Sequence, residues 1–172
     1  CSVLWCRRPA TLREAFSLVP SYLMTPEDGM ARNLMDYGPA LGRRFRSLKL
    51  WMVLRAYGRR GLAAGIRRHV ELAADLQAWI AAEADWEQMA PAPMSTVLFR
   101  HRPAGMDEEE ALRRHNEALL ERVNADGRIF LSHTMVRGRF ALRLAIGNAR
   151  TEKRHIEAAW RRLREAAAAT AT

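Results

Sequence analysis

The residue whose type and setting best suit proton transfer is Tyr22, in the stretch Pro20-Ser21-Tyr22-Leu23. Residues 16–40 show no sustained hydrophobic period, and several prolines and glycines interrupt them. A tyrosine in such a long loop can close over a site, exclude water and deliver a proton. The alternative is that Tyr22 packs its ring against apolar neighbours and leaves its hydroxyl in water. Composition alone favours this alternative.

Gly42 is the second candidate, because it stands just before a basic cluster at the start of a predicted helix. The cluster consists of Arg43, Arg44, Arg46 and Lys49. Glycine lets a ligand approach the backbone closely, and a helix start favours an anion. The cationic side chains could also pair with a carboxylate or a phosphate. The alternative, a helix start with a solvated basic edge, is again favoured on local grounds.

Other patterns that carry chemistry are missing from the sequence. It has no glycine-rich phosphate loop, no nucleophile elbow and no cysteine–histidine spacing of a zinc site, so we expect no bound metal. The histidines fall on different predicted elements, where we expect structural or surface roles: His69, His101, His115, His133 and His155. Cys1 and Cys6 would point to opposite faces of a strand, so we expect no disulfide and a reducing, cytoplasmic setting.

A net charge of +9 can indicate a protein that binds nucleic acid. The arginines, however, are spread over nearly every segment and alternate with acidic residues, which is typical of ordinary solvated faces. Few aromatic residues interleave them, so a basic α+β nucleic-acid-binding module remains an alternative that the pattern disfavours. No apolar run has the length of a membrane span, and no leader pattern is present. We therefore expect no nucleic-acid partner and no membrane segment.

Hydrophobic periodicity predicts mainly helices in the first half of the chain. Ser2–Cys6 has the pattern of a buried strand, which suggests that the chain is a fragment of a longer polypeptide. A short helix is predicted at Pro9–Ala15. The next, Arg44–Tyr57, is apolar around most of its circumference and is expected to be buried between layers. Gly58 and Gly61 separate it from a helix at Leu62–Glu83.

The second half alternates predicted strands and helices. The strands are Trp86–Met89, Ser95–Arg100, Arg128–Met135 and Arg139–Ile146, the last two joined by a hairpin turn at Arg137-Gly138. Asp107 and Glu110 resemble a capping box for a helix that continues to Asn124, and Thr151 is the expected N-cap of the last helix. This order predicts an α+β fold, with a small antiparallel sheet that carries helices on one face.

The run LGRRFRSLKLWMVLRAYGRRGL, Leu41–Leu62, closely resembles the group II pyridoxal-phosphate-dependent decarboxylases of the aromatic L-amino-acid type. The segments CSVLWCRR, LVPSYL, IRRHVELA and RFALRLAIGNARTEKRHIEAAW occur in the same order as in that family. The resemblance covers essentially all 172 residues.

This resemblance implies a fold-type-I enzyme that is normally a homodimer. Residues 1–47 would be the end of the large α/β domain that binds pyridoxal phosphate, with its last strand and a catalytic loop at about residues 16–35. Residues 48–172 would be the C-terminal small domain. The lysine that forms a Schiff base with the cofactor is expected just upstream of Cys1. The chain would then hold no cofactor-binding residue and would be inactive alone.

The resemblance further implies a carboxy-lyase of amino-acid metabolism. It would remove the α-carboxyl group of an aromatic L-amino acid (tryptophan, tyrosine, Dopa or phenylalanine) and give the amine and carbon dioxide. Tyr22 matches the loop tyrosine that protonates the substrate carbon once carbon dioxide has left. Gly42 matches a substrate-pocket glycine that is serine in histidine decarboxylases. Relatives with phenylalanine in place of Tyr22 are aromatic aldehyde synthases, which remain the alternative within the family.

Overall fold

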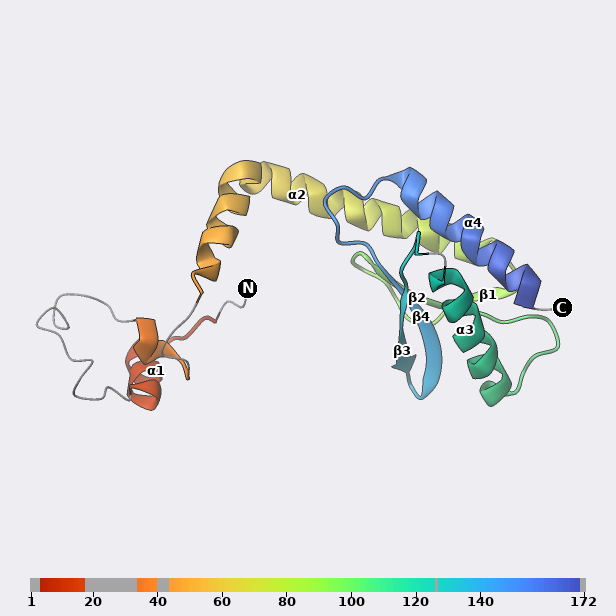
Figure 1. Cartoon of the computed structure of the whole chain (residues 1–172), viewed down its shortest axis with the longest axis horizontal. Helices are drawn as coiled ribbons and strands as arrows, with labels where there is room; N and C mark the ends of the chain where they lie inside the picture. Colours follow the sequence, from red (N-terminus) through yellow and green to blue (C-terminus); the bar gives the residue numbers. More distant parts are fainter. Residues whose placement is uncertain (1–3, 18–33, 40–43, 126, 171–172) are drawn as a thin grey trace, which may run out of the picture. The chain divides into compact units, whose positions relative to one another are not determined.

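The computed structural model describes residues 4–17, 34–39, 44–125 and 127–170 (Figure 1). The chain divides into two compact units, Cys1–Arg59 and Arg60–Thr172. The predicted division between residues 47 and 48 is a different kind of boundary, drawn from a family resemblance, and it stays a prediction.

The first unit contains α1 (Pro9–Phe16), the 3-10 helix η3 (Leu34–Tyr37) and the start of α2 (Arg46–Ala81). Proline at the first position of α1 suits a helix start, since its fixed φ is helical, and the predicted short helix is confirmed. The predicted buried strand is wrong over Leu4–Cys6, where Leu4 and Trp5 are 73% and 90% exposed. A strand needs a hydrogen-bonded neighbour, and no described segment pairs with these residues.

The start of α2 is helical as predicted, but it is not buried between layers. Its large apolar side chains, such as Leu48, Trp51 and Leu54, are 42%, 58% and 49% exposed. The period of the sequence therefore predicts the helix correctly, whereas burial depends on what packs around it. Gly58, with φ 62° and ψ 175°, interrupts the helix, which confirms the predicted break. The helix resumes at once, so Gly61 lies within it.

The second unit is built on a four-stranded antiparallel sheet, which confirms the predicted α+β class. Its strands are β1 (Trp86–Gln88), β2 (Thr96–His101), β3 (Ser132–Val136) and β4 (Arg139–Ala145), in the order β1-β2-β4-β3. Arg137 and Gly138 both have positive φ, 51° and 78°, as a tight two-residue hairpin between β3 and β4 requires. The predicted third strand began too early, since β3 begins at Ser132.

Two helices complete this unit, α3 (Glu109–Asn124) and α4 (Lys153–Thr170). The predicted N-cap of α3 is wrong: the carboxylate of Glu108 accepts from the backbone N–H groups of Glu110 (3.0 Å) and Ala111 (2.7 Å). Asp107 instead accepts a hydrogen bond from Arg102 at 2.6 Å.

The predicted N-cap of α4 is wrong as well. Thr151 lies two positions before the first helical residue, Lys153, and its N–H donates to the carbonyl of Asn148 at 2.9 Å. The sequence pattern predicted neither the side-chain bond between Arg102 and Asp107 nor the backbone bond from Thr151 to Asn148.

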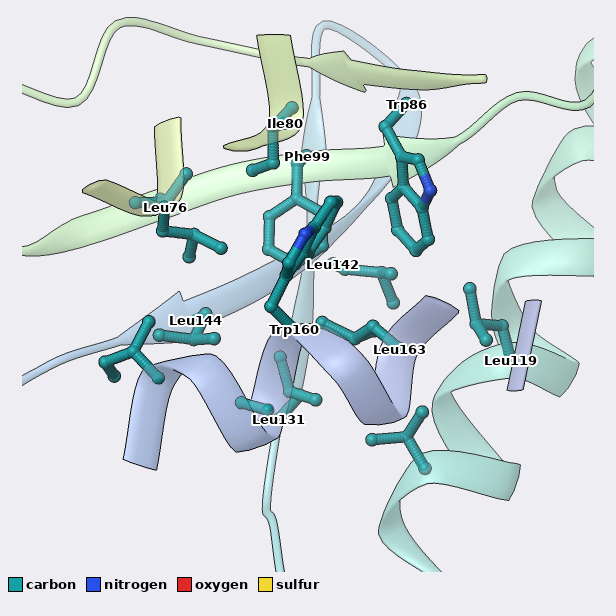
Figure 2. Packing of buried hydrophobic residues seen from close by; sticks show 14 of the residues in the cluster. Leu76, Ile80, Trp86, Phe99, Leu119, Leu131, Leu142, Leu144, Trp160 and Leu163 are labelled. Atoms are coloured by element: carbon teal, nitrogen blue, oxygen red, sulfur yellow. The ribbon is translucent and has the colours of Figure 1, made fainter. Parts of the chain in front are cut away.

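The core of the second unit lies between the sheet and the helices (Figure 2). Two cross-strand pairs, Val97 with Leu144 and Phe99 with Leu142, place four buried side chains on one face of the sheet. The second part of α2, α3 and α4 supply the facing side chains: Leu72, Leu76, Ile80, Leu119, Val123, Ile156, Trp160 and Leu163. Each such side chain contributes roughly 1.5–3 kcal/mol by leaving water.

Candidate functional site

The two residues that the sequence singled out, Tyr22 and Gly42, both lie outside the described residues. Their roles stay predictions, and the structure describes only the segments that flank them. Tyr22 lies between α1 and η3, and Gly42 lies between η3 and α2.

The segments on either side of Tyr22 are tied to one another. The carboxylate of Asp36 in η3 is 4% exposed and lies 3.3 Å from the guanidinium Nε of Arg13 in α1. A buried carboxylate needs such a partner, since removing a charge from water without one is costly. The described residues that precede and follow Tyr22 in the sequence are therefore joined by an ion pair.

The segment that follows Gly42 presents positive charge to solvent. Arg44, Arg46 and Lys49 are all exposed, and none of the three forms an ion pair with another described residue. The first turn of α2 contains no acidic side chain that would neutralise them. The predicted basic edge at this helix start is therefore present, with Phe45 exposed among the charges.

A second group of charged residues, in the other unit, is a structural cluster. Arg100 of β2 has a side chain that is 2% exposed, and it donates hydrogen bonds to Glu87 of β1 and Glu109 of α3. Arg139 of β4 lies 3.3 Å from Glu109 and 3.4 Å from Glu87. Burial acts to raise the pKa of Glu109, but the hydrogen bonds and charges of Arg100 and Arg139 prevail and lower it. The cluster joins three strands, β1, β2 and β4, to the start of α3.

Sequence reasoning left the histidines apart, whereas the structure brings two of them together. His101 at the end of β2 and His115 in α3 are buried, and their ring nitrogens lie 2.7 Å apart. A signal existed in the sequence: His115 stands three residues after Leu112 and four before Leu119, on the inward stripe of the predicted helix. No comparable pattern in the sequence marked its partner His101 at the end of β2. His133 and His155 are exposed, and His69 is half-buried.

Two kinds of site are not found in the part of the chain that the structure describes. No three histidine, cysteine, aspartate or glutamate side chains gather closely enough there to hold a metal ion. The described helices also include none that is long and apolar enough to cross a membrane.

Comparison with known proteins decides the family. The model of the pyridoxal-dependent decarboxylase conserved domain matches residues 1–102, more than half of the chain. The chain belongs to this family. Tryptophan decarboxylase 2 of Oryza sativa subsp. japonica is 41% identical over 97% of this chain, and phenylacetaldehyde synthase of Arabidopsis thaliana is 38% identical over 97%. The chain spans about a third of the length of these relatives, 34% of each.

Solved structures of family members match the fold as well. A crystal structure of Oryza sativa TDC with PLP and tryptamine superposes with a TM-score of 0.86 at 33% identity, covering 95% of this chain and 34% of the other. The 4-hydroxyphenylacetaldehyde synthase of Rhodiola rosea gives a TM-score of 0.77 at 29% identity, over 96% and 33% of the two chains. The predicted resemblance and the predicted α+β fold are both confirmed.

The described residues of this chain do not fit a covalent site for pyridoxal phosphate. The sequence contains two lysines, Lys49 and Lys153, and both are exposed. Lys153 donates a hydrogen bond to the carboxylate of Asp75, 2.9 Å away, and this bond together with the negative charge of Asp75 raises the pKa of Lys153, so the amine stays protonated and poorly nucleophilic. Lys49 is exposed among other cations at the start of α2. Both lysines are therefore solvated surface amines.

Proposed function

We propose that this chain is the C-terminal part of a pyridoxal-phosphate-dependent decarboxylase that converts an aromatic L-amino acid into its amine and carbon dioxide. The observation that carries the proposal is the 41% identity to a tryptophan decarboxylase over 97% of the chain. Tyrosine decarboxylase 2 of Narcissus pseudonarcissus, 37% identical over 94% of the chain, supports the same substrate class. The acceptable ring would be an indole or a phenol.

In this proposal the cofactor supplies the electron sink for the carbanion that decarboxylation leaves, and a lysine upstream of Cys1 holds it. Tyr22 delivers a proton to the substrate carbon from which carbon dioxide has departed. Gly42 forms a pocket wall without a side chain, which leaves room for an aromatic ring. The ion pair between Arg13 and Asp36 supports this proposal, because it joins α1 to η3, the described elements on either side of Tyr22 in the sequence.

The wider setting is also part of the proposal. Residues 1–47 would complete the large domain and residues 48–172 would form the small domain. We place the protein in the cytoplasm as a homodimer, without nucleic-acid or membrane partners. Support for dimerisation comes from the apolar side chains on the first part of α2, which are exposed in the single chain.

The test is Tyr22→Phe in the full-length protein, meaning this chain with the upstream segment that the proposal requires. The variant should still bind the cofactor and release carbon dioxide. Without the phenol proton, however, the substrate carbon stays open to dioxygen, and the product should shift from amine to aldehyde, ammonia and hydrogen peroxide. Products are quantified by liquid chromatography with a peroxide assay.

Tyr57→Phe is the matched control, because Tyr57 is an exposed tyrosine in α2 and its loss should leave the product unchanged. Undiminished amine output from Tyr22→Phe would remove Tyr22 from the mechanism.

An aldehyde synthase is the second candidate. The 38% identity to phenylacetaldehyde synthase is close to the identity found for the decarboxylases, so overall similarity does not separate the two activities. Tyr22 argues against the synthase, since the resemblance places phenylalanine at that position in such enzymes. Peroxide formation by the unaltered protein would instead favour the aldehyde synthase over the decarboxylase.

A further inference from the structure

The contact between His101 and His115 holds the end of β2 to the N-terminal half of α3. Nδ1 of His101 lies 2.7 Å from Nε2 of His115, a hydrogen-bonding distance, and both residues are buried, 3% and 7% exposed. Their rings are tilted by 34° with centroids 5.0 Å apart. The two nitrogens therefore face one another across a space that holds one hydrogen and excludes water.

His101 has no second orientation open to it. Its other ring nitrogen, Nε2, lies 2.9 Å from Oδ2 of Asp85. Its backbone N–H donates to the Asn116 side-chain oxygen at 2.9 Å, and its carbonyl accepts from the Asn116 amide at 2.8 Å. The ring of Trp86 covers it at a centroid distance of 4.7 Å. A ring clamped in this way cannot turn to avoid a clash at Nδ1.

Whether the contact is attractive or repulsive depends on how many protons the two rings carry. When both rings are neutral, His101 carries its proton on Nε2, facing Asp85, and Nδ1 accepts from Nε2–H of His115. With one added proton, His101 donates from both nitrogens and Nε2 of His115 accepts. With two added protons both facing nitrogens carry hydrogen, and the hydrogen bond becomes a repulsive contact between two cations.

We propose that the His101–His115 contact is a pH-sensitive latch, which stays closed while the pair carries at most one extra proton and releases the N-terminal half of α3 when both rings are charged. The same geometry explains why acidification should act locally. Charging both rings breaks the side-chain link between His101 and His115, while the hydrogen bonds of Asn116 and the apolar contacts of α3 involve no titrating group.

Further charged groups surround the latch. Asp85, Glu83, Arg161, Arg164 and Glu165 line the same surface depression as His101, and they come from the turn between α2 and β1 and from α4. The residues that flank His101 are Arg100 of β2 and Arg102, just past the end of the strand, and they pair with Glu87, Glu109 and Asp107. None of these named groups is a histidine, the side chain whose ordinary pKa lies nearest physiological pH.

Burial, followed by the nearby His101, lowers the pKa of His115 below the usual range for histidine. A lowered histidine pKa means that the closed state binds fewer protons than the open one. The stability of the contact is then fully present above the pKa of a free histidine, about 6.5, and is lost as pH falls below it. The direction agrees with a latch that opens in acid.

Hydrogen-exchange mass spectrometry of the 172-residue chain tests the proposal, using peptides within residues 109–118 at pH values from 7.5 to 5. Exchange is corrected for the intrinsic pH dependence of amide chemistry. The open fraction of these peptides should rise about tenfold per pH unit below about 6.5, because one proton is taken up on opening. Peptides from α4 should show no comparable rise.

His115→Gln is the informative variant, since the glutamine amide can donate to Nδ1 of His101 but cannot take up a proton. It should abolish the pH response, and His101→Gln should do the same through the other partner. His133→Gln, which replaces an exposed histidine of β3, should retain the response. An open fraction in the unaltered chain that does not change between pH 7.5 and pH 5 overturns the latch, whether or not either variant folds. A full response in His115→Gln overturns it equally.

Discussion

The guanidinium of Arg100 shows how a single residue can organise the sheet. It is almost fully buried, and its partners Glu87 and Glu109 come from a neighbouring strand and from the first turn of α3. Because Glu87 and Glu109 are 29% and 44% exposed on their side chains, water compensates part of their charge when the arginine is removed. Arg100 therefore matters mainly through the hydrogen bonds that it donates at the junction.

Arg100→Met should destabilise the chain by about 2 kcal/mol at pH 7, since charge-assisted hydrogen bonds are lost while the buried stem is kept. Urea unfolding followed by far-UV circular dichroism measures the change. Arg113→Met is the control: Arg113 pairs with Glu117 at 2.9 Å on the solvated face of α3, and its loss should leave the stability nearly unchanged. Equal losses in the two variants would contradict the structural role of Arg100.

The same cluster predicts how stability depends on pH in acid. The pKa of Glu109 is lowered in the folded chain, so its contribution is present above the pKa of a free glutamate, about 4.3, and disappears as pH falls below it. In Arg100→Met this loss should be smaller than in the unaltered chain. Unfolding midpoints at pH 5, 4 and 3 provide the comparison, and parallel pH profiles in the two proteins would contradict it.

At the scale of elements, Gly58 decides how α2 is interrupted. Its φ of 62° combined with ψ of 175° belongs to a region that only glycine enters readily. No atom beyond its chain neighbours lies within 4 Å of where a Cβ would stand, so a side chain meets no steric obstacle there. The need for glycine is therefore purely one of backbone conformation.

Gly58→Ala should destabilise the break by roughly 1–3 kcal/mol, or convert the junction into continuous helix. Gly65→Ala is a matched control, because Gly65 also has open space around its Cβ position but lies in helical backbone, where alanine should stabilise by roughly 0.5–1 kcal/mol. Urea unfolding and the helical signal at 222 nm distinguish the two. Stabilisation by both alanines, with no change in helical signal, would show that Gly58 does not require its observed conformation.

The elements also show what can be predicted from sequence. Phe140, Leu142 and Leu144 alternate with Arg143 and Ala145, and that period of two correctly predicts β4 and its buried face. The helix caps were mispredicted, because Asp107 pairs with Arg102 and α4 begins two positions after Thr151, and the folded loops set both features. The His101–His115 pair depends on how a strand end meets a helix, which no local period specifies. Tyr22 and Gly42 came from the family resemblance together with weak local patterns.

For the whole molecule, the net charge of +9 coexists with extensive ion pairing in the second unit. Many of its arginines lie against carboxylates, as in the pairs of Arg102 with Asp107 (2.6 Å) and Arg164 with Glu83 (3.1 Å). Such paired charges favour ordinary solvated faces over a nucleic-acid surface. The chemistry that family membership points to needs a lysine site, which the two exposed lysines of this chain do not provide.

The most direct test of the proposed function compares two proteins, each mixed with pyridoxal phosphate: the full-length protein and the 172-residue chain. Each is given tryptophan, tyrosine, Dopa and phenylalanine, and amine and carbon dioxide are measured together. We predict equal amounts of amine and carbon dioxide from at least one of these amino acids with the full-length protein, and none with the chain alone. No carbon dioxide from any of the four with the full-length protein, or aldehyde in place of amine, would contradict the proposal.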